Sequence, residues 1–238
     1  VPAVITGKPI ALGGSLGRGD ATARGGYYLV RHLADDLKLG KVMRVAVQGF
    51  GNAGQYVAQL LAGDGHRIVA VSDSQGAVYA GNGLNVEALL AAKAQGKSVT
   101  ATVGQHGHEA LDPDKIVGVQ CELLVPAALE NMIHAENAKS VRAKLILELA
   151  NVVLRNILAN AGGVTVSIFE WVQNRQGYYW TEQEIHGRLQ SIMEREGRTI
   201  WELSRQKGIP MRTGAYVHAL GRLAEAIEAH GTQSFFTS

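Results

Sequence analysis

One run of the sequence, residues 45–61, constrains the fold more than any other. An apolar stretch at 45–47 leads into a GxGxxG turn at 49–54, and the turn leads directly into a helical pattern at 55–61. A strand, a glycine turn and a helix in this order form the first half of a dinucleotide-binding βαβ unit. The run therefore predicts a Rossmann-like α/β fold with a phosphate cradle at this turn.

Each glycine of the turn has its own physical reason. Gly49 lets the chain turn sharply off the strand, Gly51 lets a pyrophosphate approach bare backbone, and Gly54 lets the helix pack closely on the strand. Amide groups and the dipole at the start of the helix favour anionic phosphates. Because glycine makes up 29 of 238 residues, the prediction depends on the flanking strand and helix. A second apolar run at 68–72 ends at Asp73, close to the spacing of roughly 20 residues expected for a ribose-binding acid.

Composition narrows the class of protein. With 46% hydrophobic and 18% charged residues and 5 prolines, the chain is expected to be folded and soluble. The 23 basic residues balance 21 acidic ones and are spread along the chain, so no nucleic-acid partner is expected. The single Cys121 provides neither a disulfide framework nor a thiolate metal site, which fits a reducing cytoplasm. No apolar run is long enough for a membrane span, and the start at Val1, without a methionine, suggests a fragment.

The pattern along the chain predicts a doubly wound, mostly parallel sheet with an α-helical C-terminal extension. Further strands are expected at 68–72, 123–125 and 144–149, and helices at 20–39 with Gly40 as C-cap, 86–94, 128–138, 181–206 and 213–230. Thr181 and Glu184 form a capping-box pattern at the start of one of the late helices. Residues 1–163 are expected to form the dinucleotide-binding domain, and residues 164–238 the helices that pack on it and reach the substrate cleft.

Several segments together resemble the glutamate dehydrogenase branch of the Glu/Leu/Phe/Val dehydrogenase superfamily. They are TGKP at 6–9, LGGSLGR at 12–18, GFGNAG at 49–54, ANAGGV at 159–164 and VSIFEWVQN at 166–174. The resemblance covers essentially the whole chain, and it corresponds to the cofactor-binding domain of that family with its C-terminal helices.

The resemblance implies a role for particular residues. It puts Arg18, Thr22, Asn151 and Asn160 near the nicotinamide and its ribose, Phe50, Gly51 and Asn52 at the pyrophosphate, Asp73 and Ser74 at the adenosine ribose, Pro126, Ala127 and Ala128 beside the nucleotide, and Val164 and Ser167 at the substrate. Three-residue spacing places Val164 and Ser167 on one helix face. A hydroxyl there suits the distal carboxylate of glutamate, whereas relatives acting on leucine, valine or phenylalanine are expected to lack it.

Plainer interpretations exist for the same residues taken alone. Asn160 can be a turn residue, Ser167 a solvent-facing helix serine, Arg18 a surface charge and Asp73 a strand-end turn acid. The pair at 170–171 is interpreted as helix packing, with the tryptophan buried and the glutamate exposed. The histidines, among them His66, His108 and His186, show no i, i+4 pairing for a metal site, and surface positions are expected for them.

Two departures from the family pattern matter. The family's catalytic lysine and aspartate lie on an N-terminal substrate domain, the lysine in a GGGKGG-type loop, and that motif is absent here. Lys8 belongs to a different, linker-side segment, so no catalytic residue is expected in this chain. After Asn151 the family continues with a Gly-Pro-Thr-Thr-Pro stretch, a helix and a strand, all of which this sequence lacks. Either these residues are deleted in the protein, or they form a mobile loop that faces the cofactor and is missing from the sequence as numbered. The second explanation is favoured, because such loops are often mobile when the cofactor is absent.

The resemblance implies an NAD- or NADP-dependent enzyme that interconverts L-glutamate with 2-oxoglutarate and ammonia, as a homohexamer. NAD is weakly favoured, because Asp73 would accept bonds from a free ribose hydroxyl and repel a 2′-phosphate, unless it points away and Ser74 or Arg67 meets the phosphate. Two alternatives stay open: a stand-alone dinucleotide-binding regulatory module, and a branched-chain or aromatic amino-acid dehydrogenase.

Overall fold

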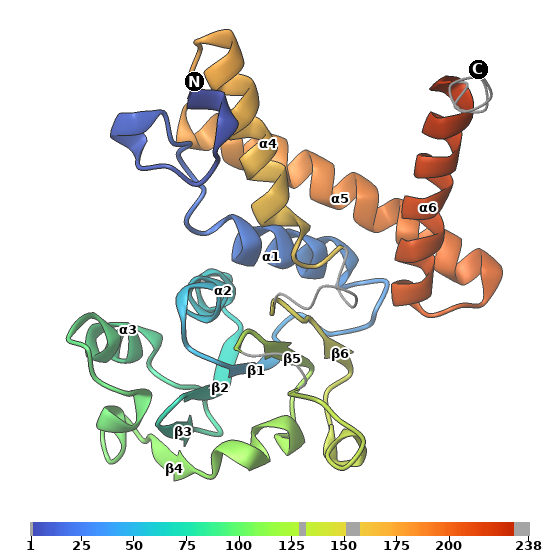
Figure 1. The fold of residues 1–238 in the computed structure, drawn as a ribbon. Helices are drawn as coiled ribbons and strands as arrows, with labels where there is room; N and C mark the ends of the chain where they lie inside the picture. The colour runs from blue at the N-terminus through green and yellow to red at the C-terminus, as the bar shows by residue number, and fades with distance from the viewer. Residues whose placement is uncertain (1, 129–131, 151–157, 231–238) are drawn as a thin grey trace.

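A six-stranded sheet forms the centre of the molecule (Figure 1). The computed structural model describes residues 2–128, 132–150 and 158–230. Within these residues the strand order is β4-β3-β2-β1-β5-β6. The strands are β1 Arg44–Gln48, β2 Arg67–Asp73, β3 Gly76–Tyr79, β4 Glu109–Leu111, β5 Leu123–Pro126 and β6 Leu145–Ile146. The predicted mostly parallel α/β sheet is confirmed, since β2, β1, β5 and β6 run parallel. The strands β3 and β4 were not predicted; β3 pairs antiparallel with both β2 and β4.

The chain changes direction across the sheet at β1. From β1 it moves outward to β2 and β3 on one side, and it later returns to place β5 and β6 on the other side. Ligands of open α/β sheets bind at such a switch point, outside the carboxyl ends of the strands. The topology therefore singles out the loops that follow β1 and β5.

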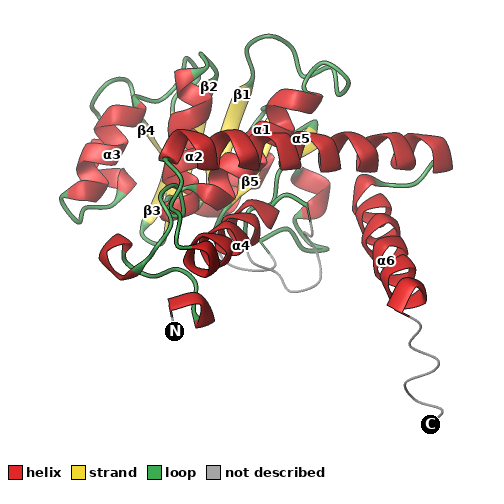
Figure 2. Ribbon diagram, turned by 90° about the horizontal axis from the view of Figure 1, so that it is seen from above, coloured by secondary structure: helices red, strands yellow, loops and turns green. Residues whose placement is uncertain are grey.

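Helices cover one face of the sheet in two layers (Figures 1 and 2). The helices of the described residues are α1 Ala21–Leu33, α2 Asn52–Gly63, α3 Val86–Ala94, α4 Ala161–Gln176, α5 Glu182–Lys207 and α6 Met211–His230, of which all but α6 contribute to this cover. Apolar side chains of α1 and α2 share one core with Val45 and Val47 of β1, and α4 and α5 pack on α1 from above. The far end of α5 carries α6, which stands away from the sheet in both views.

The opposite face of the sheet carries a second, smaller core. Ala46 and Leu124 on that face pack with Ile116, Val117 and the buried Cys121. Ile116 and Val117 belong to the 3-10 turn η4 Pro113–Gly118. The other 3-10 turns are η1 Pro2–Val4, which packs on α4, η2 Ile10–Leu12, η3 Val99–Thr102 and η5 Ala138–Ser140.

One predicted helix end and one predicted helix were wrong. The first helix ends at Leu33, because the chain then tightens into turns, with Lys38 N–H bonded three residues back and Lys38 itself at φ 53°. Gly40 is therefore not its C-cap. The helix expected at 128–138 is also absent from its described part, where residues 132–137 form bends and turns. The capping box at Thr181 is confirmed, with both of its reciprocal hydrogen bonds present.

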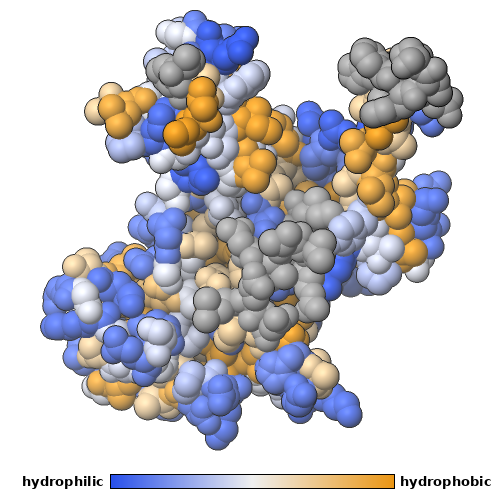
Figure 3. All heavy atoms as spheres, in the orientation of Figure 1, coloured by the Kyte–Doolittle hydropathy of each residue, from blue (hydrophilic) through white to orange (hydrophobic). Residues whose placement is uncertain are grey.

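The surface of the helical layer is unevenly polar. Figure 3 shows apolar residues gathered on the arm that α4 forms with the N-terminal segment and along α6. Val164 and Ile168 on α4 and Leu220 on α6 are all more than half exposed. In the part of the chain that the structure describes, no helix combines the length and apolar character needed to span a membrane.

Candidate dinucleotide-binding site

The residues predicted to surround the nucleotide meet at one edge of the sheet. The parallel strands β1, β2 and β5 end there, and they are followed by Gly49, Ser74 and Ala127. Backbone hydrogen bonds join these ends, from Gly49 N–H to the Ser72 carbonyl at 3.0 Å and from Ala127 N–H to the Gln48 carbonyl at 2.8 Å. The turn after β1 and the turn after β5 therefore flank the topological switch point.

The three glycines of the first turn are required for three different reasons. Gly49 has φ +93°, and a Cβ there would also lie 2.5 Å from the Cβ of Ala128. A Cβ on Gly54 would collide with the carbonyl oxygen of Gly49, so this glycine lets α2 pack against the turn. A Cβ on Gly51 would meet no atom within 4 Å, which leaves its backbone open to a ligand. This geometry matches the division of roles expected for a diphosphate cradle.

A second group of predicted residues lies where α1 and α4 begin. A Cβ on Gly163 would lie 2.7 Å from the Thr22 hydroxyl and 3.7 Å from the Arg18 guanidinium. Arg18 Nε donates a hydrogen bond to Ser167 Oγ at 3.2 Å. The side chain of Asn52 donates to the Gly19 carbonyl at 2.6 Å and so ties this group to the glycine turn. The fold thus brings together residues that are up to 149 positions apart in the sequence.

The two residues predicted to meet the substrate line the same hollow. Val164 and Ser167 border a space of about 590 Å³ together with Ile168, Trp171 and the N-terminal segment at 3–6. Val164 is 66% exposed, whereas Ser167 is half-buried. The expectation that three-residue spacing would place both side chains on one face agrees with this geometry.

The remaining predicted residues lie around these groups. Asn160 is the N-cap residue of α4, half-buried and without a side-chain capping bond. Phe50 is buried beneath the glycine turn, and Ala128 is exposed beside it. Asn151 lies outside the described residues.

Asp73 differs from the acid expected at a ribose. Its carboxylate accepts four hydrogen bonds: from Ser98 Oγ and Gln75 N–H on one oxygen, both at 2.9 Å, and from Val99 N–H at 2.9 Å and Lys93 Nζ at 3.1 Å on the other. Burial raises the pKa of Asp73, but these donors outweigh it and hold the pKa below its ordinary value. Since a carboxylate offers about four lone-pair positions, its accepting capacity is filled by the protein.

Ser74 and Arg67, the two residues predicted as alternative partners of a 2′-phosphate, lie at opposite ends of β2. Ser74 follows the end of β2 and is exposed, whereas Arg67 is the first residue of the same strand. A seven-residue strand spans about 20 Å, so Arg67 lies at the opposite edge of the sheet. Arg67 therefore has no access to a nucleotide at the carboxyl edge, and that expectation was wrong.

The interpretation of residues 170 and 171 was reversed. Glu170 is fully buried and Trp171 is 46% exposed. The carboxylate of Glu170 accepts from Gly7 N–H at 2.8 Å and pairs with Lys8 Nζ at 2.5 Å. Sequence alone gave no signal for this pairing, because the partners are more than 160 residues apart.

The expectation of surface histidines was also wrong in part. His108 is 2% exposed, and its Nε2 accepts a hydrogen bond from Asn85 N–H at 2.9 Å. His186 Nε2 lies 3.6 Å from Asp20 and 3.9 Å from Glu182, four residues before it on α5. The i, i+4 spacing of Glu182 and His186 could have been found in the sequence. Among the described residues, no group of three or more potential ligands is arranged to hold a metal ion.

Comparison with known proteins identifies the family. The sequence profile of the Glutamate/Leucine/Phenylalanine/Valine dehydrogenase family matches residues 13–156 and 152–231. The chain belongs to this family. It is 39% identical to the NADP-specific glutamate dehydrogenase of Synechocystis sp. over 99% of its length, and 38% identical to a cryptic catabolic NAD-specific glutamate dehydrogenase of Bacillus subtilis over 97%.

Solved structures of glutamate dehydrogenases share the fold. A hetero-hexameric enzyme from Thermus thermophilus superposes with a TM-score of 0.86 at 33% identity over 97% of this chain. The enzyme from Peptoniphilus asaccharolyticus superposes with a TM-score of 0.80 at 31% identity over 96%. The chain covers 58% and 57% of these two structures, and 60% and 57% of the Synechocystis and Bacillus enzymes. It therefore spans less than two thirds of the length of each of these family members.

The family match is interrupted where the sequence departs from the family pattern. The two matched stretches overlap at 152–156, directly after Asn151. The alignment with the Synechocystis enzyme has 258 positions and includes 99% of this chain, which is about 236 of its 238 residues. About 22 positions of that enzyme therefore have no counterpart here. The overlap of the two matches agrees with a missing segment after Asn151.

Proposed function

We propose that this chain is the NAD(P)-binding part of a glutamate dehydrogenase, an enzyme that reversibly converts L-glutamate to 2-oxoglutarate and ammonia. The observation that carries the proposal is the glycine cradle at the switch point, where Gly51 leaves bare backbone at the start of α2 while Gly49 and Gly54 fit their crowded surroundings. Residues 1–163 would form the cofactor-binding unit, and residues 164–238 the helices that return to the substrate cleft.

The residues present fit a dinucleotide. Backbone amides of Gly51 and Asn52, at the positive end of the α2 dipole, would hold the diphosphate. Arg18, Thr22 and Asn160 would surround the nicotinamide end, with Asn151 near its ribose, while Ser74, Ala127 and Ala128 would border the adenosine end. The bound nicotinamide would supply the hydride acceptor, and the protein would orient it towards the substrate Cα.

Substrate choice is proposed to depend on Ser167. Its hydroxyl accepts from Arg18, so its own proton stays available to a carboxylate oxygen. Val164 would provide an apolar wall in the same hollow. A donor beside an apolar wall suits the distal carboxylate of glutamate better than the side chain of leucine, valine or phenylalanine.

The weak preference for NAD rested on a free carboxylate at Asp73. Because that carboxylate is filled by protein donors and paired with Lys93, it can neither bind a ribose hydroxyl strongly nor present an uncompensated charge to a 2′-phosphate. We therefore propose that this chain binds both NAD and NADP. The relatives agree with an open choice, since one is NADP-specific and another NAD-specific.

Fluorescence titration with NADH and NADPH tests the proposal. Saturable binding of both cofactors, with affinities within about tenfold of each other, is the expected result. An affinity ratio above a hundredfold would contradict the proposed indifference, and absence of binding to either would contradict the proposed function.

The whole enzyme is proposed to need a part that this chain does not contain. Lys8 is paired with the buried Glu170 and is not available as a catalytic lysine, so the groups for proton transfer would lie on a separate N-terminal domain. We expect a homohexamer in the reducing cytoplasm for the full enzyme. This chain alone should bind cofactor but not oxidise glutamate, and measurable turnover by the purified chain would contradict that division.

A stand-alone nucleotide-binding module is the second candidate, since the glycine turn proposed to hold the diphosphate lies wholly within this chain. The intact mass of the native protein separates the two. A mass well above the 25.4 kDa of this chain supports the enzyme, whereas an equal mass supports the module.

A further inference from the structure

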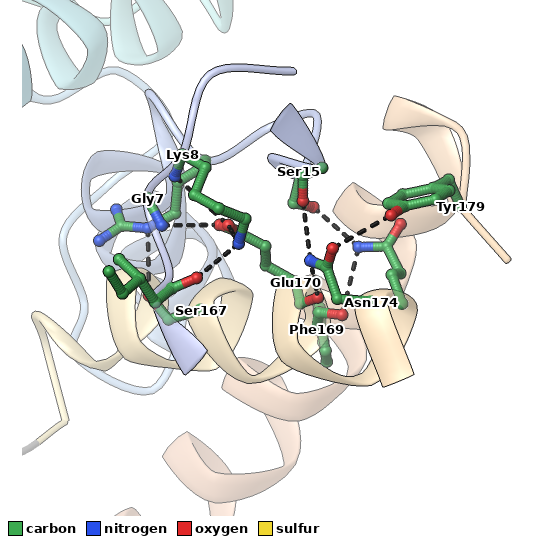
Figure 4. A network of polar contacts seen from close by, with 12 residues as sticks. Gly7, Lys8, Ser15, Ser167, Phe169, Glu170, Asn174 and Tyr179 are labelled. Atoms are coloured by element: carbon green, nitrogen blue, oxygen red, sulfur yellow. Dashed lines mark hydrogen bonds and ion pairs between the residues drawn. The ribbon is translucent and has the colours of Figure 1, made fainter. Parts of the chain in front are cut away.

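One face of α4 carries a row of polar side chains that all bind the N-terminal segment. We call the row Ser167, Glu170, Gln173 and Asn174 the α4 ladder; Figure 4 shows these contacts from close by. Gln173 Nε2 donates to Ser15 Oγ at 3.0 Å, and Asn174 Nδ2 donates to the Gly13 carbonyl at 2.7 Å. With the Arg18–Ser167 bond, three members of the ladder bind the stretch at 13–18.

Glu170 binds the N-terminal segment further upstream. It receives the backbone N–H groups of Gly7 and Lys8, at 2.8 and 3.3 Å, and the ammonium group of Lys8. Burial opposes ionisation of Glu170, but these donors outweigh it and hold the pKa of the carboxyl below its ordinary value. Glu170 is also the one charged member of the ladder, and its side chain is fully buried.

A stiff turn connects the two parts of the segment. The Pro9 carbonyl accepts from both Leu12 N–H at 2.9 Å and Gly14 N–H at 3.0 Å. A Cβ on Gly14 would collide with the Lys8 carbonyl oxygen, so the turn is closed tightly on itself. A displacement of Lys8 is therefore passed on to residues 14–18 rather than absorbed by a flexible loop.

We propose that Glu170 is a positioning residue: by fixing Gly7 and Lys8 on α4, it sets the register of the N-terminal segment and thereby places Arg18 against Ser167. A buried charge needs its partners, so the position of Lys8 is specified more strongly than a neutral contact would specify it. Glu170 lies one helical turn from Ser167 on the same face of α4. Its effect on substrate binding rests on the proposed function, whereas its effect on Arg18 does not.

Hydrogen exchange measured by NMR tests this proposal in the chain as it stands. The variants are Glu170→Gln, which removes the charge but keeps the shape, and Lys8→Met, which removes the ammonium group and leaves the two backbone donors. Glu202→Gln is the matched control, because Glu202 is an exposed glutamate of the neighbouring helix α5. The signals followed are the amides of Gly7 and Lys8, the Nε–H of Arg18, and amides of strand β1 as a measure of global unfolding.

In Glu170→Gln, the exchange of the Gly7 and Lys8 amides and of the Arg18 Nε–H should all accelerate at least tenfold, while exchange in β1 stays unchanged. Lys8→Met should accelerate the same signals by a smaller factor, and Glu202→Gln should accelerate none. Faster exchange at Gly7 and Lys8 with an unaltered Arg18 would show a local anchor only and overturn the proposal. Equal acceleration in β1 would show a general stabilising role and also overturn it.

A parallel titration with NADH keeps this inference separate from the proposed function. If the wild-type chain binds no cofactor but Arg18 responds to Glu170→Gln, the proposed function fails and the positioning role stands. If cofactor binds and Arg18 does not respond, the positioning role fails alone.

Discussion

Gly51 and Gly54, three residues apart in the sequence, give the sharpest prediction. Gly51 is the N-cap residue of α2 and Gly54 lies in the first turn of that helix, and both have backbone angles outside the left-handed region. A methyl group on Gly54 would overlap the carbonyl oxygen of Gly49, whereas a methyl group on Gly51 would project into open space. The same substitution should therefore damage stability at one position and ligand binding at the other.

The expected magnitudes follow from these contacts. Overpacking costs about 1–3 kcal/mol, and each kcal/mol lowers the melting temperature of a domain this size by about 2–4 °C, so Gly54→Ala should melt about 2–12 °C lower. Gly51 is the N-cap residue of α2 with φ −80°, which alanine adopts, so Gly51→Ala should change stability by no more than about 1 kcal/mol. Its methyl group would lie where the diphosphate approaches the backbone, and affinity for NADH should fall about tenfold or more.

Thermal unfolding and NADH fluorescence titration, on the same protein preparations, measure the two effects. Gly63→Ala is the matched control, because Gly63 lies at the exposed end of the same helix and a Cβ there would meet no atom within 4 Å. It should leave both quantities unchanged or raise stability slightly. Undiminished NADH affinity in Gly51→Ala would refute the cradle, and an unchanged melting temperature in Gly54→Ala would refute the packing argument.

Four further predictions follow from individual side chains. Asp73→Asn should lower the free energy of unfolding, measured by urea titration, by about 1–3 kcal/mol, because it disrupts the ion pair with Lys93. The ratio of NADH to NADPH affinity should change by no more than about threefold, and a larger change would show that Asp73 contacts the adenosine ribose. Burial, the main cause, and the nearby His106 lower the pKa of His108, so as the pH falls the unfolded chain binds a proton at this histidine before the folded chain does, and the free energy of unfolding should decline below about pH 6.5. A His108→Gln variant should show a smaller decline between about pH 7.5 and 5.5, and an identical decline would exclude His108 as its source. Ser167→Ala in the full enzyme should weaken glutamate use by about 1.5–3 kcal/mol with cofactor affinity retained, and unaltered kcat/KM would remove Ser167 from the substrate pocket. Burial raises the pKa of Cys121 to about 11, so the native chain should resist thiol alkylation at pH 8, and rapid labelling would contradict its burial.

The geometry of the glycine turn could be predicted from the sequence because its determinants are local. The apolar strand, the spacing of Gly49, Gly51 and Gly54 and the following helix all lie within 17 consecutive residues, and each glycine answers a steric demand made by its neighbours. The capping box at Thr181 was predictable for the same reason, since both partners lie within one helical turn.

What could not be predicted depends on contacts between distant residues. The sequence marks Asp73 as a strand-end acid, but the donors that fill its carboxylate come mainly from residues 93–99. The apolar pattern around position 170 is compatible with either Glu170 or Trp171 facing inward. Glu170 is the buried residue because its carboxylate pairs with the ammonium group of Lys8. The approach of Arg18 to Ser167 was expected from the family resemblance rather than from the residues themselves.

A crystal structure of this chain with NADH bound tests the central claim most directly. The account predicts the diphosphate at the start of α2, within hydrogen-bond distance of the Gly51 or Asn52 backbone N–H, and the nicotinamide directed towards Arg18 and Thr22. A fully occupied cofactor located elsewhere on the molecule, with the turn at 49–52 making no contact to phosphate, would contradict it.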